Sequence, residues 1–133
     1  MVSSTMSKAL LIVIALAESA TGLALLAAPS VVVVFLIGAG LEEPGAVVVA
    51  RVAGAALLSL ALACWLVRAA GASLAGRAVI AALLLYNVGV AAILIHAVFG
   101  SGLSGAGTWP AILLHTAVAT WCVACLRGRP ATA

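Results

Sequence analysis

The residue with the clearest chemical potential is Glu18, the one carboxylate within a long apolar run from Ala9 to Ala28. A helix of about 20 residues rises roughly 30 Å, which matches the hydrocarbon thickness of a bilayer. Glu18 would then lie near the midplane, where an ionisable group costs several kcal/mol unless it is paired, protonated or hydrated. Such a carboxylate can bind a cation or a proton, or it can pair with a basic side chain.

Other polar side chains fall at comparable depths when residues are counted inward from the expected helix ends at ~1.5 Å each. Tyr86 and Asn87 fall near the midplane. Ionisable residues on four helices can together form one internal site, and we expect it to be open to the outer side. Its expected members are Glu18, Arg51, Tyr86, His96 and His115. We leave Asn87 out because it is half a turn away from His96 on the same helix.

The expected roles follow from residue type. Glu18 would accept the charge or the proton, Arg51 would be its counter-ion or bind an anion, and the histidines would carry protons or act as ligands. The alternative is a structural role, in which these groups fix the register of the helices. Arg51 is also shallow enough for its guanidinium to reach the membrane edge without entering the site.

His96 and His115 approach the same loop from two consecutive antiparallel helices. This arrangement is the one needed for two axial ligands to haem or for two ligands to a metal ion. These two residues are the metal ligands we would expect, if the protein holds a metal, and haem is the cofactor they would suit. The alternative is a pair of histidines at the membrane edge, bonded to backbone or water.

The segment Trp121-Cys122-Val123-Ala124-Cys125 resembles a dithiol motif. It lies within an apolar helix and away from a helix N-terminus, where thiols are unreactive. We therefore expect small core residues, with a three-thiol metal site including Cys64 as the alternative. The sequence shows no nucleophile elbow, phosphate-binding loop or paired carboxylates, so we predict no catalytic residue and favour a non-enzymatic role.

The amino-acid composition indicates that membrane-spanning helices position these residues. Of 133 residues, 67% are hydrophobic and 7% charged, whereas soluble domains carry about 25% charged residues. We predict a single all-α membrane domain over residues 1–133, a four-helix transmembrane bundle. The expected spans are residues 8–28, 46–67, 78–99 and 109–126.

Residues 30–38 are apolar but too short to cross the membrane. We expect an interfacial helix there, although the segment could instead extend the first helix beyond a kink at Pro29.

Small residues predict where helices approach closely. Ala15 and Gly22 flank Glu18 on the first span, and Ala50 and Gly54 are four residues apart on the second. We therefore expect a compact antiparallel bundle.

Basic residues predict the orientation of the bundle. They fall at the N-terminus, in the second loop and at the C-terminus: Lys8, Arg68, Arg77, Arg127 and Arg129. Glu42 and Glu43 lie in the first loop. The positive-inside rule then places both termini of this multi-pass membrane protein in the cytoplasm. A signal-peptide-like site, Ala15-Leu16-Ala17, is not expected to be cleaved because the apolar run continues past it.

The same observations restrict the partners. The net charge of +3 comes from scattered residues, which argues against nucleic acid. A bundle this small has little internal volume. Besides the lipid bilayer, we therefore expect a homo-oligomer or a larger membrane complex.

Two resemblances add expectations. The pattern Glu18-x-x-x-Gly22, Pro29 and Arg51-x-x-Gly54, over residues 8–68, resembles the DoxX-like small bacterial four-helix membrane proteins. That resemblance implies a multi-pass four-helix bundle of the bacterial inner membrane, often an accessory subunit of a membrane oxidoreductase.

The second resemblance is shorter. Leu16-Ala17-Glu18 with Thr21-Gly22 is similar to the first helix of the small multidrug resistance transporters. It implies a lone glutamate that exchanges protons for a cationic drug. The long first loop, the histidines and Arg51 depart from that family.

The sequence therefore predicts a non-enzymatic accessory or ligand-binding subunit with a buried polar site in the outer half of the bundle. The first alternative is a proton-coupled exporter of small cations that uses Glu18. The second is a haem- or metal-binding electron-transfer subunit that uses His96 and His115.

Overall fold

A computed structural model describes residues 2–128, with side chains from residue 5 onward. Every regular element of the described residues is a helix, which confirms the predicted all-α class. Its elements are α1 (Val2–Ala27), α2 (Pro29–Ile37), α3 (Pro44–Val67), the 3-10 turn η1 (Arg68–Ala70), α4 (Leu74–Ser101) and α5 (Thr108–Arg127). The helices α1, α3, α4 and α5 are each long and apolar enough to cross a membrane.

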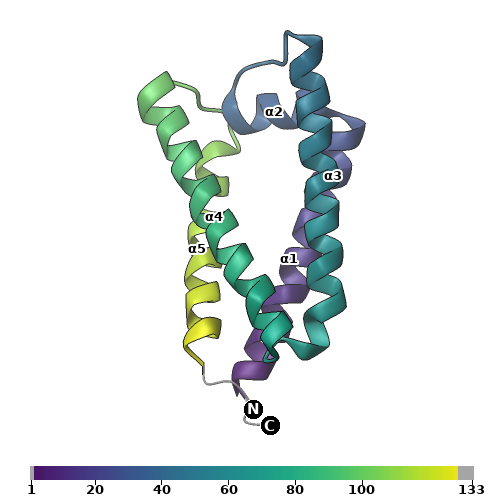
Figure 1. Cartoon of the computed structure of the whole chain (residues 1–133). Coiled ribbons are helices and arrows are strands. Elements are labelled where there is room, and N and C mark those ends of the chain that lie inside the picture. Colours follow the sequence, from purple (N-terminus) through teal and green to yellow (C-terminus); the bar gives the residue numbers. More distant parts are fainter. Residues whose placement is uncertain (1, 129–133) are drawn as a thin grey trace.

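The four long helices form two antiparallel pairs, α1 with α3 and α4 with α5 (Figure 1). Contacts within each pair are extensive, whereas contacts between the pairs are few. The pairs converge at the end where α1 begins and α5 ends, and α2 lies across the opposite end (Figure 1).

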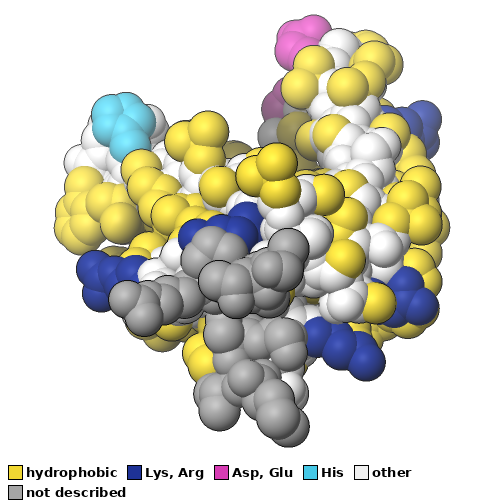
Figure 2. Space-filling model, turned by 60° about the horizontal axis from the view of Figure 1, so that its bottom comes forward, with side chains coloured by type: hydrophobic (Ala, Val, Ile, Leu, Met, Phe, Trp, Pro, Cys, Tyr) yellow, Lys and Arg dark blue, Asp and Glu magenta, His cyan; other side chains and the backbone are white. Residues whose placement is uncertain are grey.

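We call the convergent end the basic end, because the basic side chains described there gather around it (Figure 2). They are Lys8, Arg68, Arg77 and Arg127. Arg77 at the start of α4 also closes the α4/α5 pair. Its guanidinium donates to the carbonyl oxygens of Leu126 at 2.7 Å and Gly128 at 2.9 Å.

The shared core of the four helices occupies the part of the bundle nearest the basic end. Its buried members are Leu10, Leu11, Ile14, Ala15, Cys64, Ile80, Leu83, Val118, Cys122 and Cys125. Farther from the basic end, buried residues such as Leu25 and Leu94 do not belong to this cluster. Each long helix buries one narrow stripe, and most of its other apolar side chains are exposed or half-buried.

The α1/α3 pair is held close by two glycines, as the small-residue pattern predicts. A Cβ atom on Gly22 would lie 2.8 Å from the Gly54 carbonyl oxygen, and one on Gly54 would lie 2.8 Å from the Gly22 carbonyl oxygen. Neither position has room for a side chain. This contact sets the antiparallel register, in which Glu18 is level with Leu58 and Arg51 with Leu25.

The helix α2 is separate from α1 and does not extend it. The helical conformation is interrupted at Ala28, which has φ −139° and ψ 62°, and Pro29 begins the new helix. Proline suits this first position because its missing N–H would have no partner there.

The far end of α2 is tied to the start of α5. The Gly107 N–H donates to the Phe35 carbonyl at 2.8 Å. The Thr108 hydroxyl donates to the Leu36 carbonyl and accepts from the Gly105 N–H at 2.8 Å. Through these bonds α2 connects the two helix pairs at the end opposite the basic end.

Candidate functional site

Glu18 lies directly above the shared core. It is one turn beyond Ala15 on α1, and its side chain is only 6% exposed. The hydroxyl of Tyr86 on α4 is the hydrogen-bond partner of its carboxyl. The sequence expectation that Glu18 faces the inside of the bundle therefore agrees with the structure.

Asn87 and His115 continue the polar layer from α4 to α5. The Asn87 side chain is 1% exposed, and its Nδ2 donates to the Leu83 carbonyl at 2.8 Å. The amide oxygen Oδ1 therefore faces His115 Nδ1, at 2.7 Å. Because an amide oxygen only accepts, Nδ1 carries the proton, and Nε2 of a neutral imidazole remains an acceptor.

The imidazole also contacts Tyr86 directly. The Tyr86 and His115 rings meet edge to face, with centroids 5.8 Å apart and an interplanar angle of 79°. Contacts therefore run from Glu18 on α1 through Tyr86 on α4 to His115 on α5. We call Glu18, Tyr86, Asn87 and His115 the Glu18 cluster.

Arg51 does not join this cluster. It is exposed on α3, and the register set by Gly22 and Gly54 places it level with Leu25. That level is two turns, or roughly 10 Å, from Glu18 along the helix axis. An outward direction suits a long basic side chain near a membrane edge.

His96 is also outside the cluster, in contrast to the sequence-based expectation. It is exposed on α4, nine residues or roughly 14 Å beyond Asn87, whereas His115 is level with Asn87. One metal ion would need both ring nitrogens within about 2 Å of it. The structure does not bring the two histidines together, and the described residues include no group of three or more potential ligands arranged for a metal ion.

The three cysteines are free and buried in the shared core. Cys64 and Cys122 are fully buried, and Cys125 is 3% exposed. They pack as the small core residues that the sequence predicts.

Asn87 is the member of the cluster that sequence reasoning missed. It lies on the buried stripe of α4, which runs through Gly76, Ile80, Leu83, Asn87, Ala91 and Leu94. A polar residue at a helical spacing of three and four within an apolar stripe indicates an internal partner. That pattern was available in the sequence.

The cluster offers a carboxyl, a phenol, an amide and an imidazole, with no activated nucleophile. Such a set can hold a proton or a small cation, or it can join helices by hydrogen bonds. Comparisons with protein-family models, with curated proteins and with solved structures found no match to this chain.

Proposed function

We propose that this chain is a small, non-enzymatic multi-pass protein of the bacterial inner membrane that binds a proton or a small cation at the Glu18 cluster. The observation that carries the proposal is the burial of Glu18 beside an uncharged partner. In the described part of the chain its carboxyl interacts with the Tyr86 hydroxyl and with no Lys or Arg. A carboxylate at membrane depth without a basic partner is stabilised by a proton or a cation.

In this proposal the protein acts as an accessory or ligand-binding subunit of a homo-oligomer or a larger membrane complex. Support comes from the exposed apolar faces of all four long helices, among them Leu16 (62% exposed), Leu85 (76%) and Leu113 (69%). Faces of this kind can pack against lipid or against helices of another chain. A DoxX-like relationship is consistent with this role and is part of the proposal.

We further propose that the basic end faces the cytoplasm, with both termini on that side. The basic residues described there and the acidic pair Glu42 and Glu43 in the loop before α3 support this orientation, since cytoplasmic loops carry the excess of Lys and Arg.

The second candidate function is proton-coupled export of small cations. It is favoured by the same feature of Glu18, because a buried carboxyl with no basic partner can release its proton when a cation takes its place. Export requires this exchange, whereas a subunit with a purely structural polar layer does not.

The test is proton release from detergent-solubilised protein on addition of a lipophilic cationic dye. We expect release from the wild type, none from Glu18→Gln, and release at a shifted pH from Glu18→Asp. Thr21→Val is the matched control, because that hydroxyl bonds only to the Ala17 carbonyl of its own helix at 3.0 Å. Wild-type protein that releases no protons with any cationic dye would exclude the exporter, and unchanged release from Glu18→Gln would exclude Glu18 as the binding group.

A further inference from the structure

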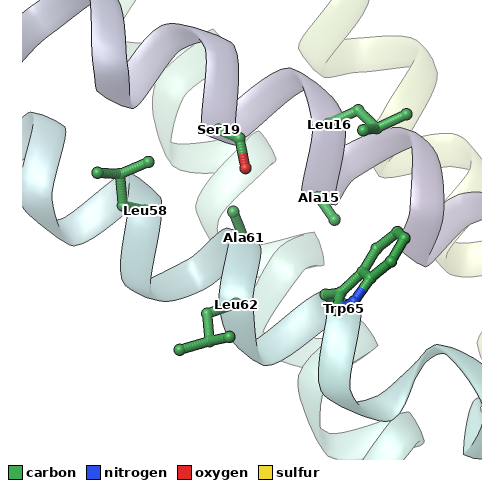
Figure 3. A pocket seen from close by; sticks show the side chains of 7 residues that line it. All are labelled: Ala15, Leu16, Ser19, Leu58, Ala61, Leu62 and Trp65. Atoms are coloured by element: carbon green, nitrogen blue, oxygen red, sulfur yellow. The ribbon is translucent and has the colours of Figure 1, made fainter.

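A groove between α1 and α3 opens on the outside of the bundle (Figure 3). Its volume is about 340 Å³. Ala15 and Ala61 form its floor, and Leu16 and Leu62 form its walls, 62% and 57% exposed. We call it the α1/α3 groove. It is separate from the Glu18 cluster, because Glu18 points from α1 into the bundle.

The groove has the character of an acyl-chain site. The groove forms because the alanine side chains are too small to fill the space between the two helices. Its lining is apolar except for the Ser19 hydroxyl and the Trp65 indole. Figure 3 shows the Trp65 ring beside Ala15 and Leu16. Indole rings are enriched at the level of lipid headgroups, which is where an acyl chain joins its headgroup.

Two cations lie at the Trp65 end of the groove. The Arg68 guanidinium lies over the Trp65 ring, 3.9 Å from its centroid. Lys8 is exposed on α1, and it is seven and eleven residues before Ala15 and Ser19. These spacings place all three on one face of the helix.

The structure also brings the two cations to the same level. Gly71, which follows η1, packs so closely against α1 that a Cβ atom on it would lie 2.8 Å from the Ser7 Cβ. Arg68 in η1 is therefore beside the turn of α1 that carries Lys8. The acidic side chains of the sequence are Glu18, Glu42 and Glu43. Glu18 is buried, and the other two precede α3 at the opposite end, so none of them neutralises this pair.

We infer that the α1/α3 groove binds an anionic phospholipid of the leaflet at the basic end. One acyl chain lies over Ala15 and Ala61, and the phosphate lies between Lys8 and Arg68. Charge complementarity selects the anionic class, because a zwitterionic headgroup brings its own cation to the phosphate. This inference rests on the proposed membrane placement and is independent of proton or cation binding at Glu18.

The test uses Trp65 as a local probe. The sequence contains three tryptophans, and Trp109→Phe with Trp121→Phe leaves Trp65 alone. This protein is reconstituted into phosphatidylcholine vesicles that contain brominated phosphatidylglycerol or brominated phosphatidylcholine at the same mole fraction. Because bromine quenches only nearby indoles, the ratio of quenching gives the relative binding constant of the two lipids. We expect brominated phosphatidylglycerol to quench more strongly.

Two variants divide the site into its parts. Lys8→Gln with Arg68→Gln should lower the relative binding constant roughly fivefold for each cation removed. Ser19→Leu fills the groove without adding charge and should reduce quenching by brominated phosphatidylglycerol. Arg127→Gln removes an exposed charge at the same end but outside the groove, and it should leave the ratio unchanged.

Equal quenching by the two lipids in the starting protein would overturn the inference. So would an Arg127→Gln effect as large as that of the double variant, because it would show diffuse attraction to the basic end. Glu18→Gln should retain the lipid preference, so failure of the proposed function leaves this result unaffected. Far-UV circular dichroism on each variant checks that the helices are intact.

Discussion

At the scale of single residues, the Glu18 cluster depends on Asn87, whose amide is hydrogen-bonded at both its nitrogen and its oxygen. Its nitrogen bonds to the Leu83 carbonyl and its oxygen to His115 Nδ1. The amide thereby fixes the imidazole, and the imidazole edge packs against the phenol that partners Glu18. Asn87 is thus a positioning residue for the cluster.

Loss of this amide should destabilise the protein measurably. Asn87→Leu leaves the Nδ1–H of His115 without its amide partner, and side-chain hydrogen bonds in membranes contribute about 1 kcal/mol. We expect a decrease of about that size in the free energy of unfolding, measured by SDS titration in mixed micelles. Thr120→Val is the control, because that exposed hydroxyl bonds only within its own helix. Equal effects of the two substitutions would contradict a special role for Asn87.

Of the five residues that the sequence grouped, the structure brings together Glu18, Tyr86 and His115, because all three lie on inward-facing stripes near the middle of their helices. The sequence grouped Arg51 and His96 with them because a count of residues from the helix ends assumes that all helices end at one level. In the structure α4 continues to Ser101 while α5 begins at Thr108, and the loop between them returns toward α2. His96 therefore extends well beyond the level of His115.

At the scale of elements, α1 and α3 approach each other so closely at Gly22 and Gly54 that neither position has room for a side chain. Each glycine faces the backbone carbonyl of the other, and backbone cannot move aside as a side chain can. Both residues could be singled out from sequence, because small residues at helix interfaces allow backbones to approach. Their partnership across the pair required the structure.

A methyl group at this contact should therefore force the pair apart. Gly54→Ala is expected to lower the free energy of unfolding by about 1–3 kcal/mol, as overpacking does. Gly89→Ala is a matched control inside α4, where a Cβ atom would meet nothing within 4 Å, and it should be neutral or slightly stabilising. The same SDS titration measures both, and a neutral Gly54→Ala would contradict the close contact.

At the scale of the whole molecule, composition alone predicts four helices able to cross a membrane. It does not predict that they form two pairs sharing a core only near the basic end. That arrangement depends on which row of side chains each helix turns toward the interior of the bundle. The stripes of α1 and α4 continue past Glu18 and Asn87 to residues such as Leu25 and Leu94, but there they pack within their own pairs. The Glu18 cluster lies where the pairs begin to separate.

The proposed orientation can be tested with single cysteines, because the native thiols are buried. We expect Glu43→Cys, in the loop before α3, to react in intact cells with a membrane-impermeant maleimide. Ala69→Cys, exposed in η1 at the basic end, should react only after lysis. The reverse pattern would place the basic end outside.

The most direct test of the central claim is an infrared titration of the purified protein, taken as the difference between wild type and Glu18→Gln. The account predicts one carboxyl band that appears and disappears with pH or with an added cation, that is missing in Glu18→Gln and that is shifted in Tyr86→Phe. A difference spectrum without any titrating carboxyl band would show that Glu18 stays in one state. The cluster would then be a structural layer between the helix pairs and not a binding site.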